Sequence, residues 1–262
     1  MKPTESAATL TRRASEACAA AILEMQSWSE RSLSVLPFQD PDVAFDGWLV
    51  LTQSAPPADA IMKFGDAVLW ARAALDHIAW DLYTDLVDHE DPRKADRLYF
   101  PVRATRGDFD GTMKATFPGA TPEVVDIFLS IQDHQTGKNL LEPLNKLSTD
   151  LRHRALGVAA YPDLKAEFVM PDVPEHLSLD LGIPQTRTLT TREPSVACLI
   201  GWRTVEGIEV ARDAAPPVPA LPELNIGLGV SGLRGALSLE SLSECLDRFS
   251  MFVLRYRLAT GR

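Results

Sequence analysis

The residue types most able to do chemistry in this chain lie close together at residues 72–77, with the sequence Arg-Ala-Ala-Leu-Asp-His. An imidazole is able to act as acid or base near neutral pH, so His77 could take a proton from a ribose hydroxyl. The guanidinium of Arg72 can stabilise the charge that a phosphate gains during cleavage, and Asp76 completes the group. Such a set would cleave RNA without a metal ion.

A second basic group, Arg152, His153 and Arg154, ends a predicted helix later in the chain. One interpretation is a solvated helix end, because the helix macrodipole favours positive charge there. The other is a substrate-binding site, since guanidinium groups pair well with phosphate oxygens. If the fold brings this group beside His77, the combined site would hold two imidazoles and three guanidiniums, enough for phosphate binding with an acid and a base.

The first motif also has a purely structural interpretation. Arg72 and Asp76 are four residues apart on a predicted helix, where an exposed ion pair would stabilise the fold by only tenths of a kcal/mol. His77 lies about 140° around that helix from Arg72, so both can meet one substrate only through long side chains or across a dimer interface. In the structural interpretation, His77 packs in the core between Trp70 and Trp80.

The helix that carries the motif is predicted over residues 58–87, where apolar residues recur at spacings of three and four. One stripe is ordinary core and contains Ile61, Phe64, Val68, Ala71, Leu75, Ile78, Leu82 and Leu86. The opposite stripe contains Trp70, Ala73, His77, Trp80 and Thr84. A helix with two such faces is typical of a central position or a subunit interface.

Similar patterns predict helices over residues 7–33, 121–132 and 238–257, and another that begins at Asn139. Residues 88–119 predict a long loop with a short strand at 99–102. Short apolar segments at 48–52, 166–170, 177–181, 196–202, 208–211 and 224–228 predict strands. The fold class that follows is α+β, a bundle of four to five helices with a small antiparallel β insert before the C-terminal helix. The predicted organisation is a helical core over 1–155, a β-rich insert over 156–235, and a C-terminal helix over 236–262 that returns to the core.

Residues 72–77 resemble the R-x4-6-H motif of the HEPN family, whose helical bundles include ribonuclease toxins and defence proteins. The resemblance implies homodimers in which two copies of the motif converge on one cleft. It also implies a toxin or phage-defence role, with an antitoxin as a partner.

A wider stretch, from about residue 60 to 155, resembles a group of uncharacterised bacterial proteins. The resemblance rests on R-x-x-L-D-H at 72–77, on F-P-V at 100–102, and on L-x-x-L at 144–147 followed by the basic triplet at 152–154. It implies a shared fold and no particular activity.

Composition narrows the remaining classes. A formal net charge of −10 argues against a surface that attracts nucleic acid or anionic lipid everywhere, so any RNA contact must be local. The three cysteines, Cys18, Cys198 and Cys245, form no CxxC pair and indicate neither a disulfide framework nor a zinc cluster. With no signal peptide and no long apolar run, the sequence predicts a cytoplasmic protein without a membrane partner.

No cofactor or metal ion is predicted. A divalent metal could use Asp76, His77, Asp150 and His153, but their spacing lacks the usual helical metal patterns. The glycines at 227, 229 and 232 match G-x-G-x-x-G, but no second parallel strand follows to complete a dinucleotide fold.

Two functions of different classes therefore remain. The first is a metal-independent endoribonuclease that acts as a homodimer, with His77 as base or acid and Arg72 with Arg152 or Arg154 on the phosphate. The second is a noncatalytic helical interaction or scaffold protein, in which Trp70, His77 and Trp80 pack against a partner.

Overall fold

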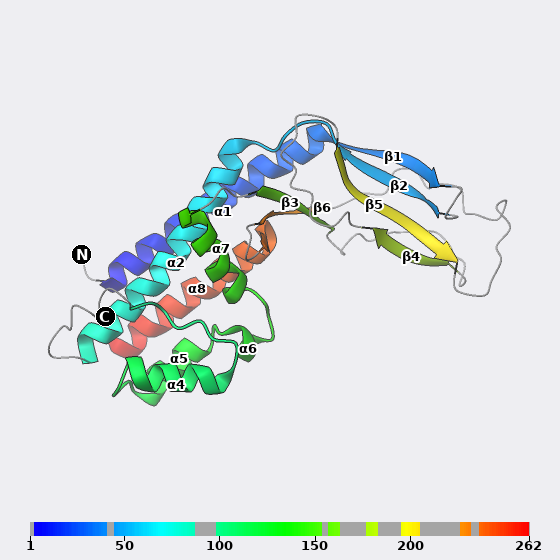
Figure 1. Cartoon of the computed structure of the whole chain (residues 1–262). Helices are drawn as coiled ribbons and strands as arrows, with labels where there is room; N and C mark the ends of the chain where they lie inside the picture. Colours follow the sequence, from blue (N-terminus) through cyan, green and yellow to red (C-terminus); the bar gives the residue numbers. More distant parts are fainter. Residues whose placement is uncertain are drawn as a thin grey trace. The chain divides into compact units, whose positions relative to one another are not determined.

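A computed structural model describes residues 3–40, 45–86, 98–153, 157–162, 177–182, 195–204, 226–231 and 236–261 (Figure 1). The chain divides into two compact units. The helical unit contains residues 1–23, 58–156 and 230–262, and the β unit contains residues 24–57 and 157–229. The fold class is α+β, a mainly helical bundle with antiparallel strands, which confirms the sequence-based prediction.

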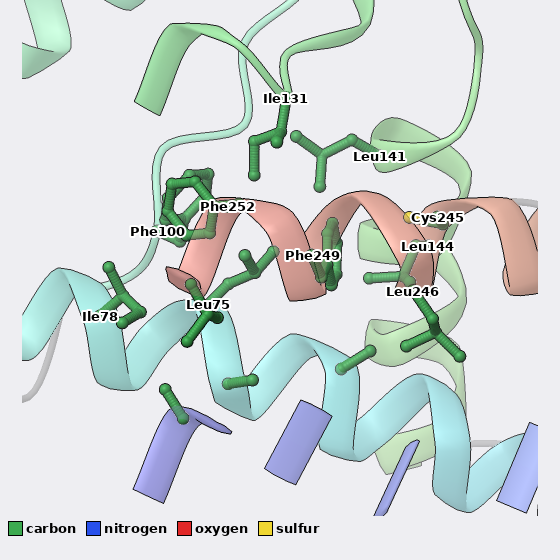
Figure 2. Close-up of a cluster of buried hydrophobic side chains, with 14 of the residues drawn as sticks. Leu75, Ile78, Phe100, Ile131, Leu141, Leu144, Cys245, Leu246, Phe249 and Phe252 are labelled. Carbon is green, nitrogen blue, oxygen red and sulfur yellow. The ribbon is translucent and has the colours of Figure 1, made fainter. Parts of the chain in front are cut away.

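The helical unit is built from α2 (Ala58–Leu86), α4 (Arg106–Thr116), α5 (Pro122–Leu129), α6 (Asp133–Thr136), α7 (Leu141–His153) and α8 (Leu239–Thr260). It also contains the first part of α1 (Pro3–Ser32) and the short strand β7 (Ala236–Ser238). Its core gathers apolar side chains from α2, α7 and α8 together with Phe100 and Ile131, as Figure 2 shows. The ring of Phe100 stacks on Phe128 at 4.9 Å and meets the edge of Phe252 at 5.5 Å.

The two stripes predicted for α2 have different environments. The first is core, since Phe64, Val68, Leu75 and Ile78 are at most 1% exposed. The opposite stripe is only half-buried at Trp70, Ala73, Trp80 and Thr84, and His77 is exposed. His77 is therefore not a core histidine in this chain, and the prediction that it packs between the two tryptophans is wrong.

Helix α4 lies inside the segment that the sequence predicted as a loop. Gly107 and Gly111 disfavour a helix there, because glycine costs about 1 kcal/mol in a helix interior. Two features offset that cost. The Thr105 hydroxyl caps the first turn by accepting the Asp108 N–H at 3.2 Å, and Phe109 and Met113, four residues apart, are both buried. With α4 and the single turn α6, the described residues contain more helices than the four to five predicted.

Residues 98–103 do not form the predicted short strand. Their backbone groups bond to side chains of α2 and of Gln132, the residue that precedes α6. Asp76 on α2 accepts the Phe100 N–H, while Gln132 accepts the Arg103 N–H and donates to the Pro101 carbonyl. The segment is thus fixed without a neighbouring strand.

The β unit contains a four-stranded sheet in the order β1-β2-β5-β4, with antiparallel neighbours throughout. Its strands are β1 (Leu33–Asp40), β2 (Phe45–Thr52), β4 (Leu177–Gly182) and β5 (Ser195–Thr204). Strands β3 (Gly157–Pro162) and β6 (Ile226–Ser231) are neighbours in a second sheet. The predicted strands at 166–170 and 208–211 lie outside the described residues.

The division of the chain departs from the predicted helical core over 1–155 at residues 24–57. Residues 24–57 group with the β unit, because β2 pairs with β5 along most of its length. Residues 236–262 group with the helical unit, where the Tyr256 hydroxyl on α8 donates to Asp81 on α2 at 3.1 Å. None of the described helices combines the length and apolar character needed to cross a membrane.

Candidate functional site

Arg72 lies inside the helical unit and is only 4% exposed. Its Nη2 atom donates to Asp76 Oδ1 at 2.9 Å, one helical turn along α2, and to the Phe100 carbonyl oxygen at 3.3 Å. Its Nη1 atom is also buried, yet it has no hydrogen-bond partner. A buried donor without a partner is rare and marks a place where a ligand or water can bind.

Asp76 joins α2 to the segment at 98–103. The same Oδ1 atom that pairs with Arg72 accepts the Phe100 N–H at 2.8 Å. The ion pair of the structural interpretation is present, and the side chains of Arg72 and Asp76 are only 5% and 19% exposed, so the small energy of an exposed pair does not apply. Burial of such a pair makes the removal of one partner costly, because the other charge is left in a poorly solvated site.

Burial also shifts the protonation equilibria of both groups. It raises the pKa of Asp76, an effect that the positive charge of Arg72 and the hydrogen bond from Phe100 partly reverse. It lowers the pKa of Arg72, which Asp76 partly restores and the nearby positive charge of Arg152 lowers further. Arg72 remains a cation at neutral pH, because the arginine guanidinium is not deprotonated in proteins. The influence of Arg152 shows that its charge on α7 lies close to Arg72.

A cavity of about 440 Å³ opens beside this ion pair. It is enclosed by α2, the segment at 98–103, α4 and α7. Three of its lining residues are arginines, five carry hydroxyl groups and none is a carboxylate: they are Arg72, Tyr99, Phe100, Pro101, Val102, Arg103, Thr112, Thr116, Asn145, Ser148, Thr149 and Arg152. We call this space the arginine cavity.

Two polar side chains fix the walls of the arginine cavity. Gln132, which is fully buried, holds the segment at 98–103 through its Nε2 donation to Pro101 O at 2.8 Å and its acceptance of the Arg103 N–H at 3.1 Å. Asp133 holds the start of α7. Its carboxylate oxygens accept the backbone N–H groups of residues 140, 141 and 142 at 2.9, 2.9 and 2.7 Å. Negative charge at a helix N-terminus is stabilising, so Asp133 anchors the helix that carries Arg152.

The structure brings some of the predicted site residues together and leaves others apart. Arg72 and Arg152 share the arginine cavity, and Asp76 supports Arg72 from outside it. His77 is exposed and does not line the cavity. His153 lies in α7, but its side chain is outside the described part of the chain, as is the whole of Arg154.

Sequence reasoning missed Arg103, Gln132 and Asp133. Arg103 follows the F-P-V segment directly, and a proline-interrupted segment beside a basic residue is a signal that could have found it. Gln132 and Asp133 bond to backbone groups as far as thirty-one residues away. No local pattern in the sequence marks such contacts.

Within the described residues, no three side chains of His, Cys, Asp or Glu gather closely enough to hold a metal ion. Of the four residues considered for a metal, Asp150 is buried in α7 and His77 is exposed on α2. No protein-family model, curated protein or solved structure matches the chain.

Proposed function

We propose that this protein is a metal-independent endoribonuclease of the toxin or phage-defence type that acts as a homodimer. Arg72 and Arg152 hold the scissile phosphate, and His77 transfers the proton. The observation that carries the proposal is that the guanidiniums of Arg72 and Arg152 line one cavity, where Arg72 keeps a buried N–H donor without a partner. Such donors stabilise the negative charge that a phosphate gains in the transition state.

The exposure of His77 determines how the site is completed. Because His77 lies about 140° around α2 from Arg72 and does not line the cavity, its imidazole reaches the phosphate from the second protomer. The half-buried indoles of Trp70 and Trp80 flank it and supply apolar contact area for that interface.

The reaction needs no group beyond these side chains. Neutral His77 takes the proton of the ribose 2′-hydroxyl, and the 2′-oxygen attacks phosphorus. The bond from phosphorus to the 5′-oxygen breaks, and this oxygen takes a proton from an imidazolium or from water. The products are a 2′,3′-cyclic phosphate and a 5′-hydroxyl end.

The test is cleavage of labelled RNA in the presence of EDTA by the wild type, by His77→Asn and by Arg152→Gln. We expect the wild type to cleave and each variant to lose activity by at least a hundredfold, the lower range for a general base. A mixture of the two inactive variants should recover part of the activity, because a mixed dimer contains one site with both residues intact. Wild-type protein that leaves RNA uncleaved, or variants that cleave as the wild type does, would contradict the proposal.

Expression in a bacterial host tests the toxin role and the antitoxin partner it implies. We expect the wild type to slow growth and His77→Ala not to. Equal growth with both, together with an intact dimer and no RNA cleavage, would favour the second candidate, a noncatalytic interaction protein. The observation that favours it is the partly exposed pair Trp70 and Trp80 on one face of α2.

A further inference from the structure

The charge balance of the arginine cavity points to a particular kind of ligand. The positive charge of Arg72 is already paired with Asp76. Arg103 and Arg152 form no ion pair with a carboxylate in the described part of the chain, so two positive charges remain uncompensated at the cavity wall. In a protein with a net charge of −10, a cavity lined by three arginines and no carboxylate is unusual and favours an anion of two charges.

The neutral groups of the cavity fit the same anion. Thr116 and Asn145 are lining residues with a hydroxyl and an amide that can donate to an anion. The hydroxyl protons of Thr112, Ser148 and Thr149 are donated to backbone carbonyls instead. Arg103 is held in place because its Nε atom donates to the Thr112 hydroxyl at 2.9 Å. Arg72 is 4% exposed and keeps its Nη1 atom without a partner. The cavity therefore has a nearly buried cation, Arg72, among its lining residues, and this cation keeps one donor atom without a partner.

The depth of Arg72 distinguishes between two forms of phosphate. A phosphodiester inside an RNA chain, such as the scissile phosphate of the proposed function, offers only two free oxygens to the arginines, because its other two oxygens continue into chains that leave the cavity. A phosphate monoester has one substituent and three free oxygens, so it can enter end-on and reach the buried guanidinium. Its charge near pH 7 is also close to −2, because its second pKa is about 6.

We propose that the arginine cavity binds a phosphate monoester end-on, with its free oxygens on Arg72, Arg103 and Arg152. The shared chemistry is a terminal phosphate, whether on a free mononucleotide or on the end of an RNA. That the phosphate belongs to RNA rests on the proposed function, whereas the phosphate site is inferred from the residues that line the cavity. The volume of about 440 Å³ lies within the range of small-molecule sites, and Tyr99, which is 52% exposed, places an aromatic ring at the rim for the group that follows the phosphate.

The experiment is calorimetric titration of the full chain with adenosine 5′-monophosphate, adenosine, and two oligonucleotides of the same sequence, one with a 5′-phosphate and one with a 5′-hydroxyl. The oligonucleotides carry 2′-O-methyl groups, so that cleavage cannot alter the binding signal. We expect a phosphorylated ligand to bind at least tenfold more tightly than its unphosphorylated counterpart. Binding of the monophosphate alone would identify the free nucleotide as the source, and binding of the oligonucleotide alone would identify the RNA end.

Charge-matched variants separate the cavity from general electrostatics. Arg152→Gln, and Arg103→Gln as a second variant, should each weaken binding of the phosphorylated ligand about tenfold or more. Arg106→Gln is the control, because Arg106 is exposed on α4, is paired with Asp110 and does not line the cavity. Equal binding of phosphorylated and unphosphorylated ligands, or an equal loss with Arg106→Gln, would overturn the inference.

The pH dependence adds a second readout. Between pH 7.5 and 5.5 the dianion fraction of a monoester with a pKa near 6 falls about fourfold, so the affinity for the monophosphate should fall by that factor. Sulfate, which stays a dianion, should bind equally at both pH values, and a parallel loss for sulfate would contradict the dianion requirement. Cleavage of unmodified RNA is measured separately. Binding of the terminal phosphate without RNA cleavage would refute the proposed ribonuclease and support this inference. RNA cleavage that requires His77, without a preference for phosphorylated ligands, would support the ribonuclease and refute this inference.

Discussion

The ion pair between Arg72 and Asp76 allows a quantitative test of the site's architecture. Replacing Asp76 by alanine leaves the guanidinium of Arg72 almost fully buried without a counter-charge and removes the acceptor of the Phe100 N–H. Breaking a buried pair costs about 3–5 kcal/mol. Because Arg72 keeps its bond to the Phe100 carbonyl, we expect a loss in the free energy of unfolding of about 3.5 kcal/mol, in the lower half of that range.

The reverse replacement should cost less. Arg72→Met keeps the volume of the side chain, and Asp76 stays 19% exposed and still accepts the Phe100 N–H, so we expect a loss of about 1.5 kcal/mol. The double variant contains no buried charge but lacks the side-chain partners of the Phe100 N–H and of the Phe100 carbonyl, for an expected loss of about 2 kcal/mol. The summed losses of the two single variants exceed the loss of the double variant by about 3 kcal/mol. This coupling energy is at the upper end of the measured range.

The assay is urea unfolding followed by circular dichroism at the helical band, since most of the described helical residues lie in one unit. Arg106 and Asp110 provide a matched control on α4. They have the same four-residue spacing and a 2.8 Å contact, but their side chains are 51% and 48% exposed. We expect a coupling below about 0.5 kcal/mol there. A coupling at Arg72 and Asp76 no larger than at this exposed pair would refute the reasoning from burial.

Three further predictions concern the support of the site and of the core. Asp133→Ala should lower the free energy of unfolding by about 2–3 kcal/mol, because three backbone N–H groups at the start of α7 lose a charged acceptor. Urea unfolding measures this loss. An unchanged urea midpoint would contradict the anchoring role of Asp133. Tyr256→Phe should lower the free energy of unfolding by about 1–2 kcal/mol in the same assay, because the Tyr256 hydroxyl donates to Asp81 in the core. An unchanged free energy of unfolding would show that this hydrogen bond contributes nothing. Burial, assisted by the charge of Asp247, raises the pKa of Cys18 to about 11, and burial raises the pKa of Cys245 as well. Both thiols should resist alkylation in the folded protein at pH 8.5, as peptide mass spectrometry reports. The stabilisation that comes from these raised pKa values should be complete below about pH 8.5, the pKa of a thiol in the unfolded chain, and should be lost as pH rises towards 11. This loss in the free energy of unfolding should be smaller in Cys18→Ala than in the wild type.

The sequence predicted the elements whose signals are local. The stripe of apolar residues on α2 and the Ser238 cap of α8 are both present, and the Ser238 hydroxyl accepts the Ser241 N–H at 2.9 Å. Strand β1 was not predicted, because it contains Pro37 and a proline within a run argues against a strand. Proline is tolerated on an edge strand, and β1 stands at the edge of its sheet.

The candidate site was predictable only in part. Arg72 and Arg152 stand on two helices that could each be read from periodicity, but their meeting depends on how α2 packs against α7. The walls of the arginine cavity depend on Gln132 and Asp133, whose bonds reach across the fold. Such contacts leave no periodic trace, because a polar side chain that satisfies distant backbone groups needs only a suitable position in space.

The pairing of β2 with β5 has a consequence for synthesis of the chain. The ribosome must add about 140 residues between the end of one strand and the start of the other, which takes about 7–30 s at typical elongation rates. During that interval the nascent hairpin of β1 and β2 lacks the neighbour that later covers the open side of β2, and an uncovered strand side invites association with other chains. Slowed translation between these strands should therefore lower the soluble yield of the protein.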